Sequence, residues 1–246
     1  MHLEEQINRF LALDHWFKTP QGMRVAHAFS HELLLIKARL TGDILIQLGH
    51  CGNNEWLNLL KYRHKWIVSP DKQLETSSLC ASFPYLPIDR DSVDCVLLPM
   101  TLDAFPSNKN PLDEIDRILK PMGYAIFWGI NPWSFWGLLF CLKRLSIFGG
   151  AGGSLTSALT LQHMMFNRGY RQCNLTSFYY IPPVSNEFFI DTFSFLNEMG
   201  KMIWPYPAAF YCLVVQKCSA RLTPLRSKVS IKKVMITEPA SWQGAS

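Results

Sequence analysis

The stretch that decides the fold is ILIQLGHCGNNEWLNLLKYRHKWIVS, residues 44–69. Its first six residues, ILIQLG, form a short apolar run that predicts a buried strand ending in a glycine-containing turn. Residues 54–62 then predict a short helix, and KWIVS (65–69) predicts a second buried strand. Two apolar strands joined through a helix are typical of the parallel β-α-β unit, so this stretch indicates an α/β protein.

The same alternation continues on both sides of this stretch. Further apolar strands are predicted at 93–98, 124–129, 173–180 and 210–217, and helices at 2–17, 21–40, 110–120, 132–144, 155–168 and 185–199. Apolar strands that alternate with amphipathic helices predict a mostly parallel sheet with helices on both faces. The ligand of such a sheet lies beyond the carboxyl ends of the strands, which directs attention to the loops after Leu48, Val68, Leu98 and Trp128.

Length and charge indicate one domain followed by a tail. The chain has 246 residues, of which 48% are hydrophobic, and this suits a single α/β domain with extra helices over residues 1–217. Residues 218–246 carry five basic residues and one acidic residue, a net +4 of the total +5. We interpret them as a flexible basic tail, with a contact to nucleic acid or anionic lipid left open. The remaining charge of about +1 gives the domain no broad basic surface for nucleic acid.

The cysteines and the N-terminus predict a cytoplasmic protein. The sequence has seven cysteines, an odd number, and no two have the Cys-x-x-Cys spacing. This indicates reduced, buried thiols rather than disulfides or a metal site. The N-terminal residues have no apolar signal core. Residues 121–142 lack charged side chains, but the turn from Gly129 to Pro132 predicts a strand and a helix there rather than a membrane span.

The most specific motifs lie between residues 82 and 138. They are Leu86-Pro87-Ile88, Ser92-Val93-Asp94 and the helix end RILKPMG (117–123). These motifs resemble the class I S-adenosylmethionine-dependent methyltransferases, in a type 11-like branch. The run NPWSFWG (131–137) is similar to a little-characterised bacterial subgroup with a degenerate cofactor motif. The resemblance implies a Rossmann-like seven-stranded sheet over residues 20–217, mostly parallel with an antiparallel last strand, and S-adenosyl-L-methionine as the cofactor.

The cofactor loop departs from the family pattern. The pattern is an apolar strand, an acidic residue and then Gly-x-Gly-x-Gly, and here Gly49 takes the place of the first glycine. Gln47 replaces the acid, Cys51 and Asn53 replace the later glycines, and Gly52 is one position out of register. Gln47 keeps a hydrogen-bonding oxygen but loses the charge that strengthens such a bond. We therefore expect weak cofactor binding, which the double change Gln47→Glu, Cys51→Gly should strengthen.

Two further residues are implied as cofactor contacts. Asp71, after the strand 65–69, corresponds to the family's ribose-binding acid, although an ordinary turn residue is an equal alternative. Ser82 corresponds to an acid near the adenine. The implied cofactor-binding set is therefore Gln47, Gly49, Asp71 and Ser82. The Gly-x-Gly-x-x-Gly spacing of dinucleotide-dependent oxidoreductases is absent from the loop, which disfavours that function.

Candidates for catalysis and metal binding are few. Methyl transfer requires mainly that donor and acceptor are aligned and water is excluded, and the sequence shows no catalytic triad. Asp103 is the only acid directly after the strand 93–98, and it is a weak candidate for a general base. His27 and His31 share a helix face, but no third ligand accompanies them, so we predict no metal site.

The segment from Trp133 to Leu142 is apolar on nearly every face of a predicted helix. Asn131 is expected to cap this helix, with Pro132 as its first residue. The helix is expected either to lie between the sheet and another helix, or to bind something apolar. In the second case Trp133 and Trp136 line the substrate site, or the helix contacts a membrane with Lys143 and Arg144 at the headgroups.

Together these features predict a methyltransferase that acts on an apolar small molecule. The alternative is a non-catalytic module of the same fold that binds a partner or a membrane surface. The predicted location is the cytoplasm, with a peripheral contact to the inner membrane through Trp133–Leu142 left open.

Overall fold

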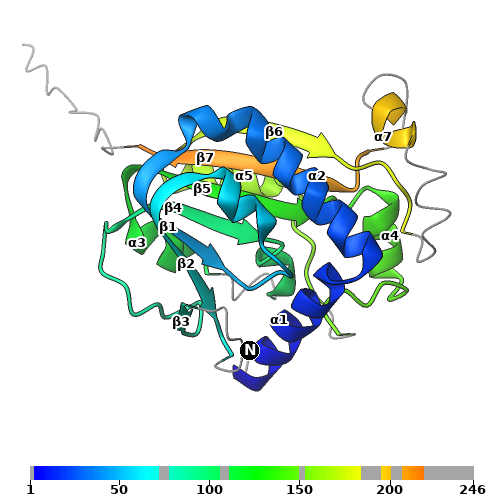
Figure 1. The fold of residues 1–246 in the computed structure, drawn as a ribbon, viewed down its shortest axis with the longest axis horizontal. Coiled ribbons are helices and arrows are strands. Elements are labelled where there is room, and N and C mark those ends of the chain that lie inside the picture. Colours follow the sequence, from blue (N-terminus) through cyan, green and yellow to red (C-terminus); the bar gives the residue numbers. More distant parts are fainter. Residues whose placement is uncertain are drawn as a thin grey trace, which may run out of the picture.

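The computed structural model describes residues 3–71, 78–105, 111–149, 153–183, 195–200 and 207–218, and it has a seven-stranded sheet at its centre (Figure 1). The strand order is β3-β2-β1-β4-β5-β7-β6, and β7 runs antiparallel to both β5 and β6 while the other neighbouring pairs are parallel. This confirms the predicted sheet with its antiparallel last strand. The strands are β1 (Thr41–Leu48), β2 (Lys61–Ser69), β3 (Leu79–Cys80), β4 (Val93–Pro99), β5 (Leu119–Ile130), β6 (Tyr170–Phe178) and β7 (Phe210–Lys217).

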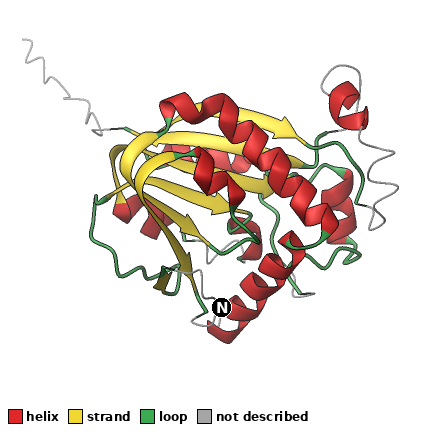
Figure 2. Ribbon diagram, in the orientation of Figure 1, coloured by secondary structure: helices red, strands yellow, loops and turns green. Residues whose placement is uncertain are grey.

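Helices lie on both faces of the sheet, as Figures 1 and 2 show. In the view of Figure 1, α2 and the 3-10 helix η2 lie in front of the strands, and α3 and α5 lie behind them. The helices are α1 (Leu3–Phe17), α2 (Pro20–Ile36), α3 (Leu112–Ile118), α4 (Phe135–Cys141), α5 (Ala158–Asn167) and α7 (Phe195–Gly200), with 3-10 helices η1 (Lys37–Arg39), η2 (Glu55–Leu59) and η3 (Leu102–Ala104).

The strands start earlier than the sequence predicts. Four of them, β1, β2, β5 and β6, begin three to five residues before the apolar runs at 44, 65, 124 and 173. The added residues of β2 are mostly exposed, and Lys61 pairs with Thr41 of β1, so backbone pairing extends the strands beyond their apolar part. The strand β3 was not predicted, because two residues carry no periodic signal.

The connection from β1 to β2 corrects another expectation. In place of a helix over 54–62, the chain forms the five-residue 3-10 helix η2, which Asn54 precedes in a left-handed conformation (φ 48°). The helix α2 covers this part of the sheet instead. Its Phe29 stacks on Trp128 of β5 with ring centroids 4.1 Å apart, and it also contacts Trp56 of η2. An N-terminal helix therefore supplies much of the apolar cover on this face.

The helix α4 is shorter than the predicted 132–144 and begins later. Ser134, rather than Asn131, is its N-cap, and the Ser134 hydroxyl accepts a hydrogen bond from the Gly137 N–H. The Asn131 side chain instead accepts a bond from the Trp133 N–H. Asn131 therefore shapes the turn before the helix.

Other predictions meet the structure in part. Cys51, Cys95 and Cys212 are buried free thiols as expected, but Cys80 and Cys141 are exposed. Most of the predicted helix 185–199 and the tail beyond residue 218 lie outside the described residues. Among the residues described, no helix is long and apolar enough to cross a membrane. The uncharged stretch 121–142 is divided between β5 and α4.

All three resemblance motifs contribute structural contacts near the starts of the strands. The Asp94 carboxylate accepts hydrogen bonds from the N–H groups of Asp43 and Ile44 and pairs with Lys120 at 2.8 Å. Glu114 and Arg117 of α3 bond to the backbone of Leu86. These contacts fix β1, β4 and β5 in register and leave the opposite edge of the sheet for binding.

Candidate functional site

The candidate site lies at the carboxyl ends of β1, β2 and β4. Cross-links between the ends of these strands hold this edge together. The Gly49 N–H donates to the Val68 carbonyl at 2.9 Å, and the Thr101 hydroxyl donates to the Leu48 carbonyl at 2.6 Å. The loop after β1 is therefore held between the ends of β2 and β4, where the ligand of a parallel sheet binds.

The loop from Gly49 to Asn54 turns sharply because three of its residues have left-handed backbones. These residues are Gly49 (φ 102°), Gly52 (φ 56°) and Asn54 (φ 48°). Counting the family motif from Gly49 assigns the later glycine positions to Cys51 and Asn53. The structure instead uses Gly52 and Asn54, which tolerate this conformation. The loop therefore keeps its tight turn with a shifted register.

Gln47 holds this loop from beneath. Its side chain is fully buried, and its amide N–H groups donate to the Gly49 carbonyl at 2.8 Å and to the Asn54 side chain. Its amide oxygen accepts a bond from the Trp56 indole N–H at 2.7 Å. All of these partners belong to the protein, so Gln47 stabilises the loop in this conformation and offers no free group to a ligand.

The helix α1 lies directly on the loop, and Figure 1 shows it beyond the arrowheads of β1 and β2. The Asp14 carboxylate accepts a hydrogen bond from the Gly52 N–H at 2.8 Å and contacts the His50 ring at 2.6 Å and Lys18 at 2.7 Å. Burial acts to raise the pKa of Asp14, but the bonds from His50, Lys18 and Gly52 outweigh it and lower the pKa to about 2. Asp14 is therefore a buried carboxylate anion on the backbone of the cofactor loop.

Two phenylalanines of α1 fill the space beside the loop glycines. A methyl group added at Gly49 would lie 3.0 Å from the Phe10 ring, and one added at Gly52 would lie 3.1 Å from the Phe17 side chain. Phe10 also packs edge-on against Phe83 at 4.8 Å. Glycines in such a loop let a ligand approach the backbone closely; here that side of Gly49 and Gly52 is in contact with α1.

The other two predicted cofactor residues lie around the same edge. Ser82 follows β3, is partly buried, and donates from its hydroxyl to the Gln6 side chain of α1 at 3.2 Å. Asp71 follows β2, and its N–H donates to the Ser69 hydroxyl at 3.3 Å. The structure thus brings Gly49 and Ser82 into contact with α1, places Gln47 next to Gly49, and places Asp71 just after the end of β2.

Asp103 is buried in η3, just after β4. Its carboxylate accepts bonds from the backbone N–H of Ile130 at 2.9 Å and of Thr156 at 3.4 Å. Burial raises the pKa of this carboxyl to about 7, although the two backbone bonds act to lower it. The bonds connect η3 to the end of β5 and to the segment before α5, which favours a structural role over that of a general base.

The two tryptophans predicted for the substrate site have opposite environments. Trp133 is 82% exposed on the turn before α4. Trp136 is 1% exposed, and its indole N–H donates to the Ile181 carbonyl at 2.8 Å. One face of α4 therefore packs on the core as the first expectation has it, and the other face is exposed; a role of Trp133 and Trp136 in binding stays a prediction.

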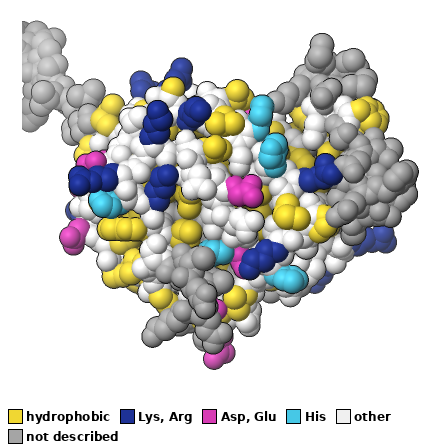
Figure 3. Space-filling model, in the orientation of Figure 1, with side chains coloured by type: hydrophobic (Ala, Val, Ile, Leu, Met, Phe, Trp, Pro, Cys, Tyr) yellow, Lys and Arg dark blue, Asp and Glu magenta, His cyan; other side chains and the backbone are white. Residues whose placement is uncertain are grey.

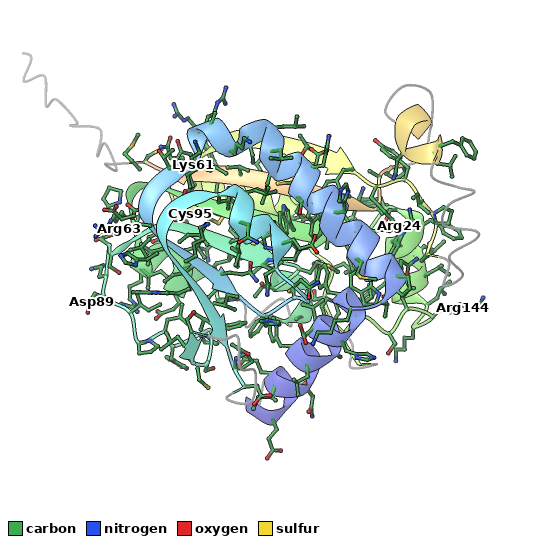
Figure 4. The ribbon with its side chains drawn as sticks, viewed as in Figure 1. Arg24, Lys61, Arg63, Asp89, Cys95 and Arg144 are labelled. Carbon is green, nitrogen blue, oxygen red and sulfur yellow. The ribbon has the colours of Figure 1, made fainter. Side chains whose placement is uncertain are left out.

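Two cavities flank this edge of the sheet. The first, of about 570 Å³, lies between the start of α2 and the loop, and Arg24, His27 and Glu55 are among its lining residues. Figure 3 shows charged and histidine side chains spread over the face that α2 covers, and Figure 4 places Arg24 on α2. The second, of about 440 Å³, is lined mostly by apolar residues of α4 and of the segment after β6.

Comparison with known proteins agrees with this geometry. Residues 56–127 match the family model described as a methyltransferase domain. The chain has the fold of the class I S-adenosylmethionine-dependent methyltransferases, so the resemblance seen in the sequence is confirmed.

Solved structures give the same result. One is an S-adenosylmethionine-dependent methyltransferase from Thermotoga maritima, with 21% identity, a TM-score of 0.60, and coverage of 86% of this chain and 98% of that one. Another is the methyltransferase in complex with the Haloferax volcanii Trm112 methyltransferase activator, with 20% identity, a TM-score of 0.57, and coverage of 85% and 98%. An Archaeoglobus fulgidus methyltransferase has 14% identity, a TM-score of 0.54, and coverage of 77% and 93%. No curated protein matches the sequence.

In this conformation the residues of the edge do not fit the cofactor. The Gly52 N–H, a donor available to a ligand carboxylate, is bonded to Asp14. The space beside Gly49 and Gly52 is filled by Phe10 and Phe17, and the amide of Gln47 is bonded within the protein. The fold is that of a methyltransferase, but α1 occupies the space beside the loop glycines.

Proposed function

We propose that this chain is an S-adenosylmethionine-dependent methyltransferase that acts on an apolar small molecule. The observation that supports an apolar substrate is the cavity of about 440 Å³ beside α4. It is lined mostly by aromatic and aliphatic side chains, which include Phe135, Trp136, Tyr179 and Ile181. Pockets of this size with mostly apolar walls and few polar groups bind apolar molecules of modest size.

The position of this cavity also supports the proposal. The helix α4 follows the end of β5 within five residues, and residues 179–182 follow the end of β6 directly. Because β5 is parallel to β4 and β1, its carboxyl end lies at the same edge of the sheet as the cofactor loop. An acceptor in the cavity would therefore lie at the binding edge, with Trp136 in the wall and Trp133 on the turn before α4.

Gly49, Asp71 and Ser82 stay our proposed contacts for S-adenosyl-L-methionine, and Gln47 belongs to the same proposed site as the residue that supports the loop. All four lie within two residues of the ends of β1, β2 and β3. When bound, the cofactor supplies an activated methyl group, so the residues of this chain would bind, orient and exclude water rather than move protons. This division of roles agrees with the bonded, buried state of Asp103.

Transfer of label from the cofactor tests the substrate class. The chain is incubated with S-adenosylmethionine labelled in its methyl group and an extract of apolar cell metabolites, and the label is counted after solvent partition. We expect label in the organic phase, and we expect Leu138→Trp to reduce it severalfold because Leu138 lines the cavity. Leu159→Trp is the control, since Leu159 is 72% exposed on α5. Label found only in water-soluble products would contradict the apolar class.

We also propose a peripheral membrane contact through the outer face of α4. Its exposed apolar side chains form a stripe that begins on the preceding turn, and Lys143 and Arg144 follow it. Figure 4 shows Arg144 at the outer edge of the molecule beside α4. Apolar residues next to cations are typical of helices that lie in an anionic membrane interface. The stripe consists of Trp133, Phe135, Leu138 and Leu142, each more than half exposed.

A further inference from the structure

We propose that α1 is a built-in plug of the cofactor site, so that α1 and the cofactor compete for the same loop. The proposal rests on the proposed function, because it concerns how S-adenosylmethionine reaches that site. The helix in question is Leu3–Phe17, and its C-terminal half carries the contacts with the loop after β1.

The Asp14 carboxylate occupies the position proposed for the carboxylate of the cofactor. S-adenosylmethionine has a free carboxylate at its amino-acid end, and a loop N–H after the first strand is a natural donor for it. In this chain the Asp14 carboxylate takes the bond from the Gly52 N–H at 2.8 Å. Lys18 and His50 contact the same carboxylate, so the anion is held from three sides.

Two aromatic side chains of α1 fill the space beside the loop glycines. Phe10 lies against Gly49 and Phe17 lies against Gly52, each where a methyl group on the glycine would come within about 3.1 Å. Both rings are almost fully buried. A ligand that approaches the loop backbone at these glycines must displace them.

The helix also reaches the other loops of the binding edge. Gln6 accepts the bond from the Ser82 hydroxyl after β3, and the Arg9 guanidinium donates to the Ala104 carbonyl after β4 at 2.6 Å. One helix therefore contacts the loops after β1, β3 and β4 together. These are the loops that would surround a cofactor at the end of this sheet.

The contact between α1 and the binding edge leaves buried polar atoms unpaired, and this favours release of α1. Within the described part of the chain, Gln6 Nε2 and Arg9 Nε are buried and have no hydrogen-bond partner. Buried polar atoms without a partner reduce the stability of the arrangement that buries them. The segment Lys18–Thr19 joins α1 to α2, and Thr19 caps α2 through the Gly22 N–H. The Thr19 hydroxyl also donates to the Trp16 carbonyl at 2.6 Å, so release of α1 has to break this bond, whereas the cap bond to Gly22 is local to α2.

Hydrogen exchange with and without S-adenosylhomocysteine tests the plug on the full chain. If α1 is displaced, the amides of residues 3–17 lose protection when this probe binds. The variant Asp14→Asn weakens the plug, so it should bind the probe about tenfold more tightly in a calorimetric titration. The control is Glu4→Gln, which removes an exposed charge from the same helix and should bind as the parent does.

Each outcome decides between the two proposals. Binding of the probe with unchanged or increased protection of residues 3–17 overturns the plug and leaves the methyltransferase proposal standing. Binding to Asp14→Asn but not to the parent supports both. Absence of binding to the parent and to Asp14→Asn, with both folded, overturns both. If Asp14→Asn does not fold, the exchange experiment on the parent decides alone.

Discussion

The Asp14 carboxylate accepts a hydrogen bond from the Gly52 N–H at 2.8 Å, across 38 positions of sequence. This bond joins the first helix to the loop after β1. In our proposal it places a protein anion where the carboxylate of S-adenosylmethionine would bind, and the first and last predictions below depend on it.

Asp14 should make the protein less stable in acid. Its pKa is about 2 in the folded chain and near 3.8 when unfolded, so its contribution is complete above about pH 4 and is lost as the pH falls toward 2. Asp14→Asn should lower the free energy of unfolding at pH 7 by about 1–3 kcal/mol. The difference from the parent should shrink between pH 4 and pH 2. Denaturant unfolding at several pH values measures it; a difference that is constant with pH would contradict the anion contact.

Asp103 should make the protein less stable as the pH rises, which is the opposite of the effect of Asp14. Because burial raises its pKa to about 7, its contribution to stability is complete below about pH 4 and is lost as the pH rises to 7. The free energy of unfolding of Asp103→Asn, relative to that of the parent, should increase by about 1–3 kcal/mol between pH 4 and pH 8. Asp89→Asn, at an exposed position, is the control. Parallel pH curves for Asp103→Asn and the parent would show that the carboxyl is solvated.

Gln47→Glu should destabilise the fold, which reverses part of the expectation from sequence. The carboxylate would lie fully buried, and its oxygens would face the Gly49 carbonyl and the Asn54 side-chain oxygen, where the Gln47 amide now donates. A buried, unpaired charge of this kind costs about 3 kcal/mol. Thermal unfolding measures the loss, with the exposed Gln172→Glu as the control. An unchanged melting temperature would mean that the loop rearranges around the acid.

The two faces of α4 should respond differently to a charge. Trp136→Asp should cost about 3–5 kcal/mol, because the indole is buried and bonded to Ile181. Trp133→Asp and Leu142→Asp should leave the melting temperature unchanged and reduce association with anionic vesicles severalfold. Leu159→Asp, exposed on α5, is the matched control. Vesicle co-sedimentation beside thermal melts separates the effects; equal vesicle binding by the parent and both surface variants would contradict the membrane contact.

The sheet could be predicted because its strands are apolar runs with clear limits. The strand β7 occupies the predicted residues 210–217, since it is buried along nearly its whole length between β5 and β6. The start of β2 could not be predicted, because exposed residues such as Lys61 join the strand only through pairing with β1. The pattern of apolar residues in a sequence predicts which strands are buried, but it does not predict where exposed backbone pairs with a neighbouring strand.

The residues that fill the site could not be predicted for a related reason. The spacing of Phe10, Leu13 and Phe17 indicates that one face of α1 is buried, but it does not show what covers that face. Lys18 is four positions from Asp14, but the two partners in the loop, His50 and Gly52, are 36 and 38 positions away and carry no local signal. The role of Gln47 was likewise hidden, because its bond to Trp56 depends on the short η2 replacing a full helix.

A crystal structure of the full chain with S-adenosylhomocysteine tests the central claim most directly. We predict that the ligand lies against Gly49 and Gly52, that its carboxylate takes the Gly52 N–H from Asp14, and that Phe10 and Phe17 have left the loop. A structure in which the ligand occupies this edge while Asp14 keeps its 2.8 Å bond to Gly52 would contradict the plug. Binding of the ligand elsewhere on the molecule would contradict the cofactor site itself.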